Sequence, residues 1–260
     1  MTGRVPGEYW LGRAADEAAR ENDVMVEQLR ISAKNLGSLA LADACDRCFW
    51  LQLRVGFKMP YQIFPGIFSS IDSYTKVMVE GWMDRHGSPP AWLSALGEIA
   101  GYEPPPHYSR FQILDPATRI LLTGTPDAVF RRPDGSCVIA DYKTARYTAG
   151  QDTLLPMYAA QLNAYRRIGK ERGLSPISEL ALIYFEPVTA EAREENYTPD
   201  GFGMEFSAHV ERVEIDERLV DRLLGEARRI GDLKTAPEGR AGCKECEAMG
   251  KVVGAIRLSH

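Results

Sequence analysis

The chain has 260 residues, of which 45% are hydrophobic and 26% are charged. This composition is typical of a globular protein that can bury a substantial core. The formal net charge of −5 argues against a protein that coats nucleic acid by charge alone, because such proteins are normally basic. No apolar run approaches the ~20 residues that span a bilayer, and residues 1–30 do not resemble a cleaved leader, so we expect a cytoplasmic protein with no membrane partner.

Helical and extended patterns alternate along the chain. Residues 1–35 are expected to form a charged helical arm. Apolar residues at helical spacing, or after a helix-starting residue, predict helices over residues 66–86, 154–172 and 216–230. Alternating or continuous apolar runs between turn residues predict strands over residues 110–114, 119–123, 128–131, 136–143, 179–186 and 204–215. Residues 238–249 are expected to be a loop.

This order of elements predicts one mixed α/β domain over residues 36–250, in which helices flank a central mixed sheet. Its core is expected over residues 65–232, and cysteine-bearing segments flank the core at residues 40–57 and 238–250. Residues 251–260 are expected to be a C-terminal tail.

Four of the five cysteines form two distant CxxC pairs, Cys45 with Cys48 and Cys243 with Cys246. In a reducing compartment such spacing indicates a metal centre rather than disulfides. Two unrelated buried pairs are the alternative. Cys137 stands alone in an apolar strand and is expected to be a small core residue.

Two short segments carry acids and a lysine: Gly124-Thr-Pro-Asp127 and Ile139-Ala-Asp-Tyr-Lys143. Because side chains alternate along a strand, Asp141 and Lys143 project from the same face, and Asp127 lies on the neighbouring strand. Hard carboxylate oxygens suit Mg or Mn, which bind phosphate oxygens, and a nearby lysine can orient a water molecule. A surface Asp–Lys pair beside an unrelated turn residue is the alternative.

Pro126-Asp127 followed by Asp141-Tyr-Lys143 resembles the PD-(D/E)XK nuclease superfamily, whose fold is a restriction-endonuclease-like core. Gln161-Leu-Asn-Ala-Tyr165 resembles the QxxxY element of its RecB-like exonuclease branch. The resemblance implies that Asp127 and Asp141 hold Mg or Mn and that Lys143 positions or activates the attacking water. It also implies that Gln161 and Tyr165 hold DNA or support the site.

The superfamily also places an acid or a histidine on the helix before these strands. Asp72 is the best candidate for this third metal-site residue, and Glu80 comes next. His86 lies near the end of the expected helix and is interpreted as a surface histidine.

The segment Cys45-Asp-Arg-Cys-Phe-Trp-Leu51 is similar to the N-terminal cysteine segment of RecB-like exonucleases that carry an iron–sulfur cluster. These include CRISPR-associated exonucleases and the AddB nuclease domain. They combine one N-terminal cysteine with three near the C-terminus, whereas this chain has two and two. The resemblance favours a [4Fe–4S] cluster, and four thiolates suit zinc as the alternative.

The resulting hypothesis is a metal-dependent DNA nuclease, an exonuclease acting on single strands or duplex ends. Arg146, Arg166, Arg167 and Tyr158 are candidate nucleic-acid contacts, with a solvated helix face or core packing as the alternative. Two other readings are a non-catalytic nucleic-acid-binding or assembly subunit and a zinc-stapled structural module. Oligomeric state and protein partners in a repair, phage or CRISPR-adaptation complex stay open.

Overall fold

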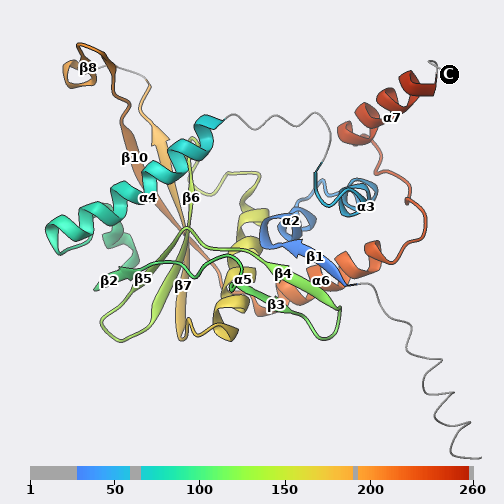
Figure 1. Cartoon of the computed structure of the whole chain (residues 1–260), viewed down its shortest axis with the longest axis horizontal. Coiled ribbons are helices and arrows are strands. Elements are labelled where there is room, and N and C mark those ends of the chain that lie inside the picture. The colour runs from blue at the N-terminus through green and yellow to red at the C-terminus, as the bar shows by residue number, and fades with distance from the viewer. Residues whose placement is uncertain (1–27, 59–65, 190–192, 258–260) are drawn as a thin grey trace, which may run out of the picture.

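The computed structural model describes residues 28–58, 66–189 and 193–257. Its centre is a five-stranded sheet with the strand order β10-β7-β6-β5-β2 (Figure 1). The strands are β2 (Gly101–Glu103), β5 (Ala128–Arg131), β6 (Cys137–Lys143), β7 (Ile177–Pro187) and β10 (Phe206–Val213). Strands β6 and β7 are parallel, and the other neighbours are antiparallel. The predicted mixed sheet is therefore confirmed.

Helices cover both faces of this sheet (Figure 1). Helix α4 (Gly66–His86) and the 3₁₀ helix η2 (Ala91–Leu96) pack on one face, and helices α5 (Leu155–Glu171) and α6 (Glu217–Gly231) pack on the other. Strand β6 shows how the sequence produces these layers. Val138 and Ala140 belong to the core under α4, whereas Ile139 belongs to the core under α5. The helices predicted over residues 66–86, 154–172 and 216–230 are thus α4, α5 and α6.

A second sheet has the order β1-β4-β3, with strands β1 (Leu29–Ser32), β4 (Ile120–Thr123) and β3 (Gln112–Leu114). It corrects the prediction of a helical arm over residues 1–35. Residues 1–27 lie outside the described part of the chain, but Leu29–Ser32 is a strand, followed by the short helix α2 (Ala33–Gly37). Parallel pairing with β4 sets Ile31 opposite Leu122 in a fully buried position. The alternation of Leu29 and Ile31 with polar residues suits this strand.

The two cysteine segments meet at one end of the molecule, where helices α3 (Asp46–Arg54) and α7 (Lys244–Arg257) lie near each other (Figure 1). Helix α7 corrects two predictions in part, because residues 238–249 were expected to be a loop and residues 251–260 a tail; residues 258–260 lie outside the described part of the chain. Glu245 and Glu247 in its first turn favour the helix N-terminus, whereas Gly250 and Gly254 weaken the helix signal in the sequence.

Smaller elements complete the fold. They are the 3₁₀ helices η1 (Ser38–Ala40) and η3 (Glu194–Asn196) and the hairpin strands β8 (Tyr197–Thr198) and β9 (Gly201–Phe202). Within the described residues, the helices are too short or too polar to cross a bilayer.

Candidate active site and cysteine centre

Asp127 directly precedes β5 and is hydrogen-bonded to the backbone of the neighbouring strand β6. Its N–H donates to the carbonyl of Ala140 (3.1 Å), and its Oδ2 accepts from the N–H of Tyr142 (2.8 Å). The two bonds flank Asp141, so the structure brings the two predicted acids together. The Pro126 before Asp127 has no N–H to donate, which suits a chain that leaves regular pairing at this point.

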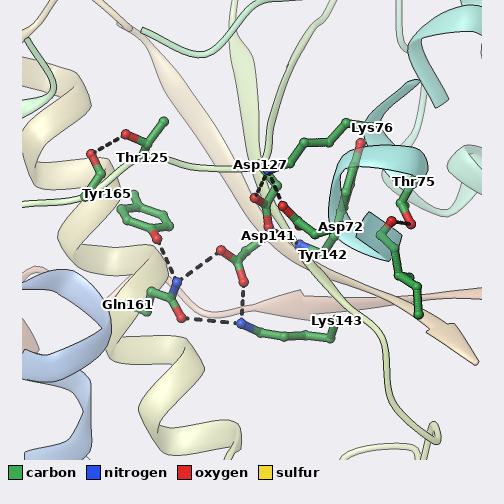
Figure 2. Close-up of polar contacts among 12 residues, drawn as sticks. Asp72, Thr75, Lys76, Thr125, Asp127, Asp141, Tyr142, Lys143, Gln161 and Tyr165 are labelled. Carbon is green, nitrogen blue, oxygen red and sulfur yellow. Dashed lines mark hydrogen bonds and ion pairs between the residues drawn. The ribbon is translucent and has the colours of Figure 1, made fainter. Parts of the chain in front are cut away.

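Asp141 and Lys143 project toward α5, as the alternation along β6 predicts (Figure 2). Gln161 of α5 donates from Nε2 to Asp141 Oδ1 (3.1 Å) and to the hydroxyl of Tyr165 (2.7 Å). Its Oε1 accepts from Lys143 Nζ (3.4 Å). The ammonium of Lys143 also lies 4.1 Å from the ring centre of Tyr158. All five residues thus form one connected group.

Asp141 has the electrostatics of a cation ligand. Burial raises the pKa of its carboxyl group, because an ionised carboxylate loses solvation there, and the neighbouring Lys143 offsets only part of this effect. Oδ2 lies 2.5 Å from Lys143 Nζ but receives no hydrogen bond of regular geometry, although it is buried. A buried carboxylate oxygen that is held by an ion pair alone, next to a second carboxylate, fits a divalent cation.

Gly124 shows why the first acidic segment begins with glycine. A Cβ at this position would lie 2.4 Å from Cε1 of Tyr165 and 3.3 Å from the Cβ of Ala33. A larger residue would therefore displace the ring of Tyr165, whose hydroxyl lies 2.7 Å from Gln161 Nε2. The same close approach joins the second sheet to helix α5.

Helix α4 contributes a lysine that the sequence analysis missed. Lys76 Nζ lies 2.7 Å from Asp127 Oδ1 and 3.0 Å from Asp72 Oδ2 (Figure 2). Asp72 therefore lies at the site, but with Lys76 between it and Asp127. The spacing of Asp72 and Lys76, one helical turn apart, was the available signal. Glu80 is half-buried one turn further along α4, and His86 stacks on Trp82 with ring centres 4.1 Å apart.

The arginines predicted to contact nucleic acid lie away from the acid group. Arg166 pairs with Glu217 of α6 (2.7 Å), and Arg167 pairs with the buried Asp115 (2.7 Å). Both arginines belong to the interface of α5 with its neighbours rather than to the acid group. Arg146 is exposed in the loop after β6.

The four cysteines of the two CxxC pairs come together, with all four Sγ atoms within 4.8 Å of one another. The Sγ–Sγ distances are 3.6 Å for Cys45–Cys246, 3.5 Å for Cys48–Cys243 and 3.4 Å for Cys48–Cys246. Across the described ranges, this is the one group of three or more Cys, His, Asp or Glu ligand atoms gathered so closely. The predicted meeting of the two cysteine pairs is therefore confirmed, and the cluster joins the N- and C-terminal segments of the described fold.

The surroundings of these cysteines favour negative charge. Each pair lies at the N-terminus of a helix, α3 or α7, where the helix dipole stabilises thiolates. Burial alone would raise the pKa of the Cys45 thiol, but hydrogen bonds from the backbone N–H of Arg240 and from neighbouring cysteines lower it to about 6. Burial and the neighbouring thiols raise the pKa of Cys48. The cysteines therefore do not all ionise easily without a metal. A bound metal ion would stabilise all four as thiolates.

A sequence model described as the PD-(D/E)XK nuclease superfamily matches residues 75–250, which is more than half of the chain. The chain belongs to the PD-(D/E)XK nuclease superfamily. No curated protein is similar enough to count as a match. A solved structure titled "Crystal structure of SSO0001" is similar over 86% of this chain and 85% of that chain, with 14% sequence identity and a TM-score of 0.41, a likeness too distant to add to the argument.

Membership of the PD-(D/E)XK superfamily suggests nuclease activity, which implies a nucleic-acid substrate. The matched range contains the acid group on β6 and α5, Lys76 and the second cysteine pair, whereas Asp72 and the first cysteine pair lie before it. A divalent cation is typical of the superfamily, and the buried oxygen of Asp141 fits one.

Proposed function

We propose that the protein is a metal-dependent DNA nuclease of the RecB-like branch, an exonuclease acting on single strands or on duplex ends. One observation supports this proposal most directly. Asp127 is bonded to the backbone on both sides of Asp141, and Lys143 lies on the same face of the same strand. Two carboxylates and an ammonium in this order are the parts that phosphodiester hydrolysis requires.

Asp127 and Asp141 would hold a Mg or Mn ion. When bound, the ion would neutralise charge on the phosphate and lower the pKa of a water molecule. Asp141 fits this role because its Oδ2 is buried without a regular hydrogen bond, and Asp127 fits because its position is set by backbone contacts rather than by a flexible loop. Asp72 stays a predicted third ligand.

Lys143 would stabilise the charge that develops on the phosphate and hold the attacking water. Its ammonium has three donors, of which the contacts with Asp141 and Gln161 engage two. Tyr158 restricts the ammonium from the other side, since a cation over an aromatic face is attracted to it. Gln161 and Tyr165 would keep Asp141 in its rotamer.

The cysteine centre would staple the two ends of the described fold, and we propose that it holds a single zinc ion. Four sulfurs around one tetrahedral ion with a Zn–S bond of about 2.3 Å lie about 3.8 Å apart. Three of the six sulfur separations are 3.4 to 3.6 Å, close to this edge length, and all six are within 4.8 Å. A four-iron cluster binds one cysteine on each iron and spreads the sulfurs further apart. Elemental analysis together with an absorbance spectrum tests this choice, and a brown, iron-containing protein would overturn it in favour of [4Fe–4S].

The nuclease proposal is tested by digestion of end-labelled single-stranded DNA, double-stranded DNA and RNA with Mg or Mn. We expect shortening of labelled DNA from an end by the wild-type protein. Lys143→Ala is expected to lower the rate by at least about a hundredfold while thermal unfolding shows that the variant is folded. Lys170→Ala is the matched control, because Lys170 pairs with Glu217 on the α6 side of α5.

Two results would count against the proposal. If purified wild-type protein with either metal cleaves none of the substrates, the non-catalytic binding subunit becomes the better account. If Lys143→Ala and Lys170→Ala lose activity equally, the ammonium of Lys143 has no special role. Cleavage of RNA alone would keep the chemistry and change the substrate.

A further inference from the structure

Lys76 places a second ammonium at the candidate metal site. Its Nζ lies 2.7 Å from Asp127 Oδ1 and 3.0 Å from Asp72 Oδ2, and its side chain is one-third exposed (Figure 2). The ammonium therefore lies between two carboxylates, one on its own helix and one directly before β5. The site thus holds a positive charge on the α4 side as well as Lys143 on the α5 side.

Lys76 affects metal binding because it contacts one of the two carboxylate oxygens of Asp127. Asp127 Oδ2 accepts the N–H of Tyr142, and Oδ1 accepts Lys76, so both oxygens have a donor. Asp141 is paired in the same way, since its Oδ2 lies 2.5 Å from Lys143 Nζ. A divalent ion shared by the two acids therefore meets an ammonium on each of them, Lys143 on Asp141 and Lys76 on Asp127.

We propose that Lys76 is a tethered cation that occupies Asp127 in the metal-free enzyme and must move off before a divalent ion binds. The inference rests on the proposed metal site of Asp127 and Asp141. Helical geometry provides the place to which Lys76 moves. Asp72 lies one turn before it on the same face of α4, and its half-exposed carboxylate can keep the ammonium after Asp127 is released. In this account Asp72 retains the lysine, which replaces its predicted role as a third metal ligand.

The consequence is a weaker affinity of the site for divalent ions than the two acids alone would give. A partly exposed ion pair is worth roughly a twofold to fivefold factor in an equilibrium constant. Removal of the ammonium of Lys76 eliminates one such competing pair and the repulsion between ammonium and metal. We therefore expect Lys76→Met to bind Mn²⁺ roughly fivefold to thirtyfold more tightly than the wild type.

Isothermal titration of the purified protein with MnCl₂ measures this affinity without any substrate. Mn²⁺ prefers oxygen ligands, so the cysteine centre does not compete for it. Lys76→Arg keeps the charge and is expected to bind Mn²⁺ about as weakly as the wild type. Lys170→Met, the matched control on the α6 side of α5, is expected to leave the affinity unchanged. If Lys76→Met does not fold, Lys76→Gln replaces it in the same titration.

Thermal unfolding gives a second readout. In chelator, Lys76→Met leaves the neighbouring carboxylates without their ammonium, so its Tm should be lower than that of the wild type, and Mn²⁺ should raise it by a larger amount. If Lys76→Met binds Mn²⁺ no more tightly than the wild type, the proposal that Lys76 competes with the metal is wrong. A wild-type protein that binds no Mn²⁺, or Asp127→Asn binding as tightly as the wild type, overturns the proposed metal site itself.

Discussion

Gln161 gives the sharpest test of how the acid group is held. The side chain is only 5% exposed, and its amide donates both to the carboxylate of Asp141 and to the hydroxyl of Tyr165. Gln161→Met keeps a similar volume but removes both donors. A hydrogen bond to a charged group contributes about 1.5–3 kcal/mol and a neutral one about 1 kcal/mol, so the free energy of unfolding should fall by about 2–4 kcal/mol. Because Asp141 also loses its orientation, the nuclease rate should fall roughly tenfold to a hundredfold.

The assay compares rates and urea unfolding for Gln161→Met and a matched variant, Asn163→Leu. Asn163 is another buried amide on α5, and it bonds only to backbone groups of Ala159, Glu214 and Asp216. We expect Asn163→Leu to be destabilised at least as much and to keep its rate per folded molecule. If both variants lose the same fraction of activity, or if Gln161→Met loses none, the support of Asp141 by Gln161 is refuted.

Three further perturbations test other parts of the molecule. Gly124→Ala places a methyl group against the ring of Tyr165. We expect the free energy of unfolding to fall by about 1–3 kcal/mol and the nuclease rate to fall as well. An unchanged urea midpoint would contradict the close approach of Gly124 to Tyr165. Cys246→Ser is expected to lose the bound metal and lower the Tm, whereas Cys137→Ala, with its thiol in the core, should keep one equivalent of metal. Equal metal loss in both would show that the centre lies elsewhere. Burial raises the pKa of Asp141 from 3.8 to about 6 in the metal-free fold. The folded protein therefore binds a proton on Asp141 more tightly than the unfolded chain does, and the free energy of unfolding should fall as the pH rises from about 4 to about 6. Urea unfolding across this range should show that dependence in the wild type and not in Asp141→Asn, and the same slope in both would exclude Asp141 as its source.

The parts of the site that depend on short-range geometry could be predicted from the sequence. Asp141 and Lys143 are two residues apart in a strand, and Gln161 and Tyr165 are four apart in a helix, so each pair had to share a face. The structure confirms both pairs by direct contacts with Gln161. The family motif then supplied the long-range step, the approach of Asp127 to β6.

Other features depend on partners that a local pattern does not reveal. Strand β1 pairs with β4, about ninety residues later, and its four residues were absorbed into the charged, helix-forming stretch that precedes them. Arg166 and Arg167 looked like phosphate contacts because the acids of α6 and of the β3–β4 turn that neutralise them are far away in the sequence. Lys76 was overlooked because its importance comes from Asp127, on a different element.

The cysteine centre also constrains the order of events during folding. Cys45 and Cys246 are 201 positions apart, so the ring that the bound ion closes includes the whole five-stranded sheet. Closing such a ring in an unfolded chain is entropically costly, whereas a folded sheet already brings its ends together. We therefore expect metal capture to come late, after the sheet has formed and α7 has been synthesised. A ribosome releases residues in sequence, so a chain stopped before Cys243 would hold only half of the ligands, and metal uptake would report that synthesis has passed Cys246.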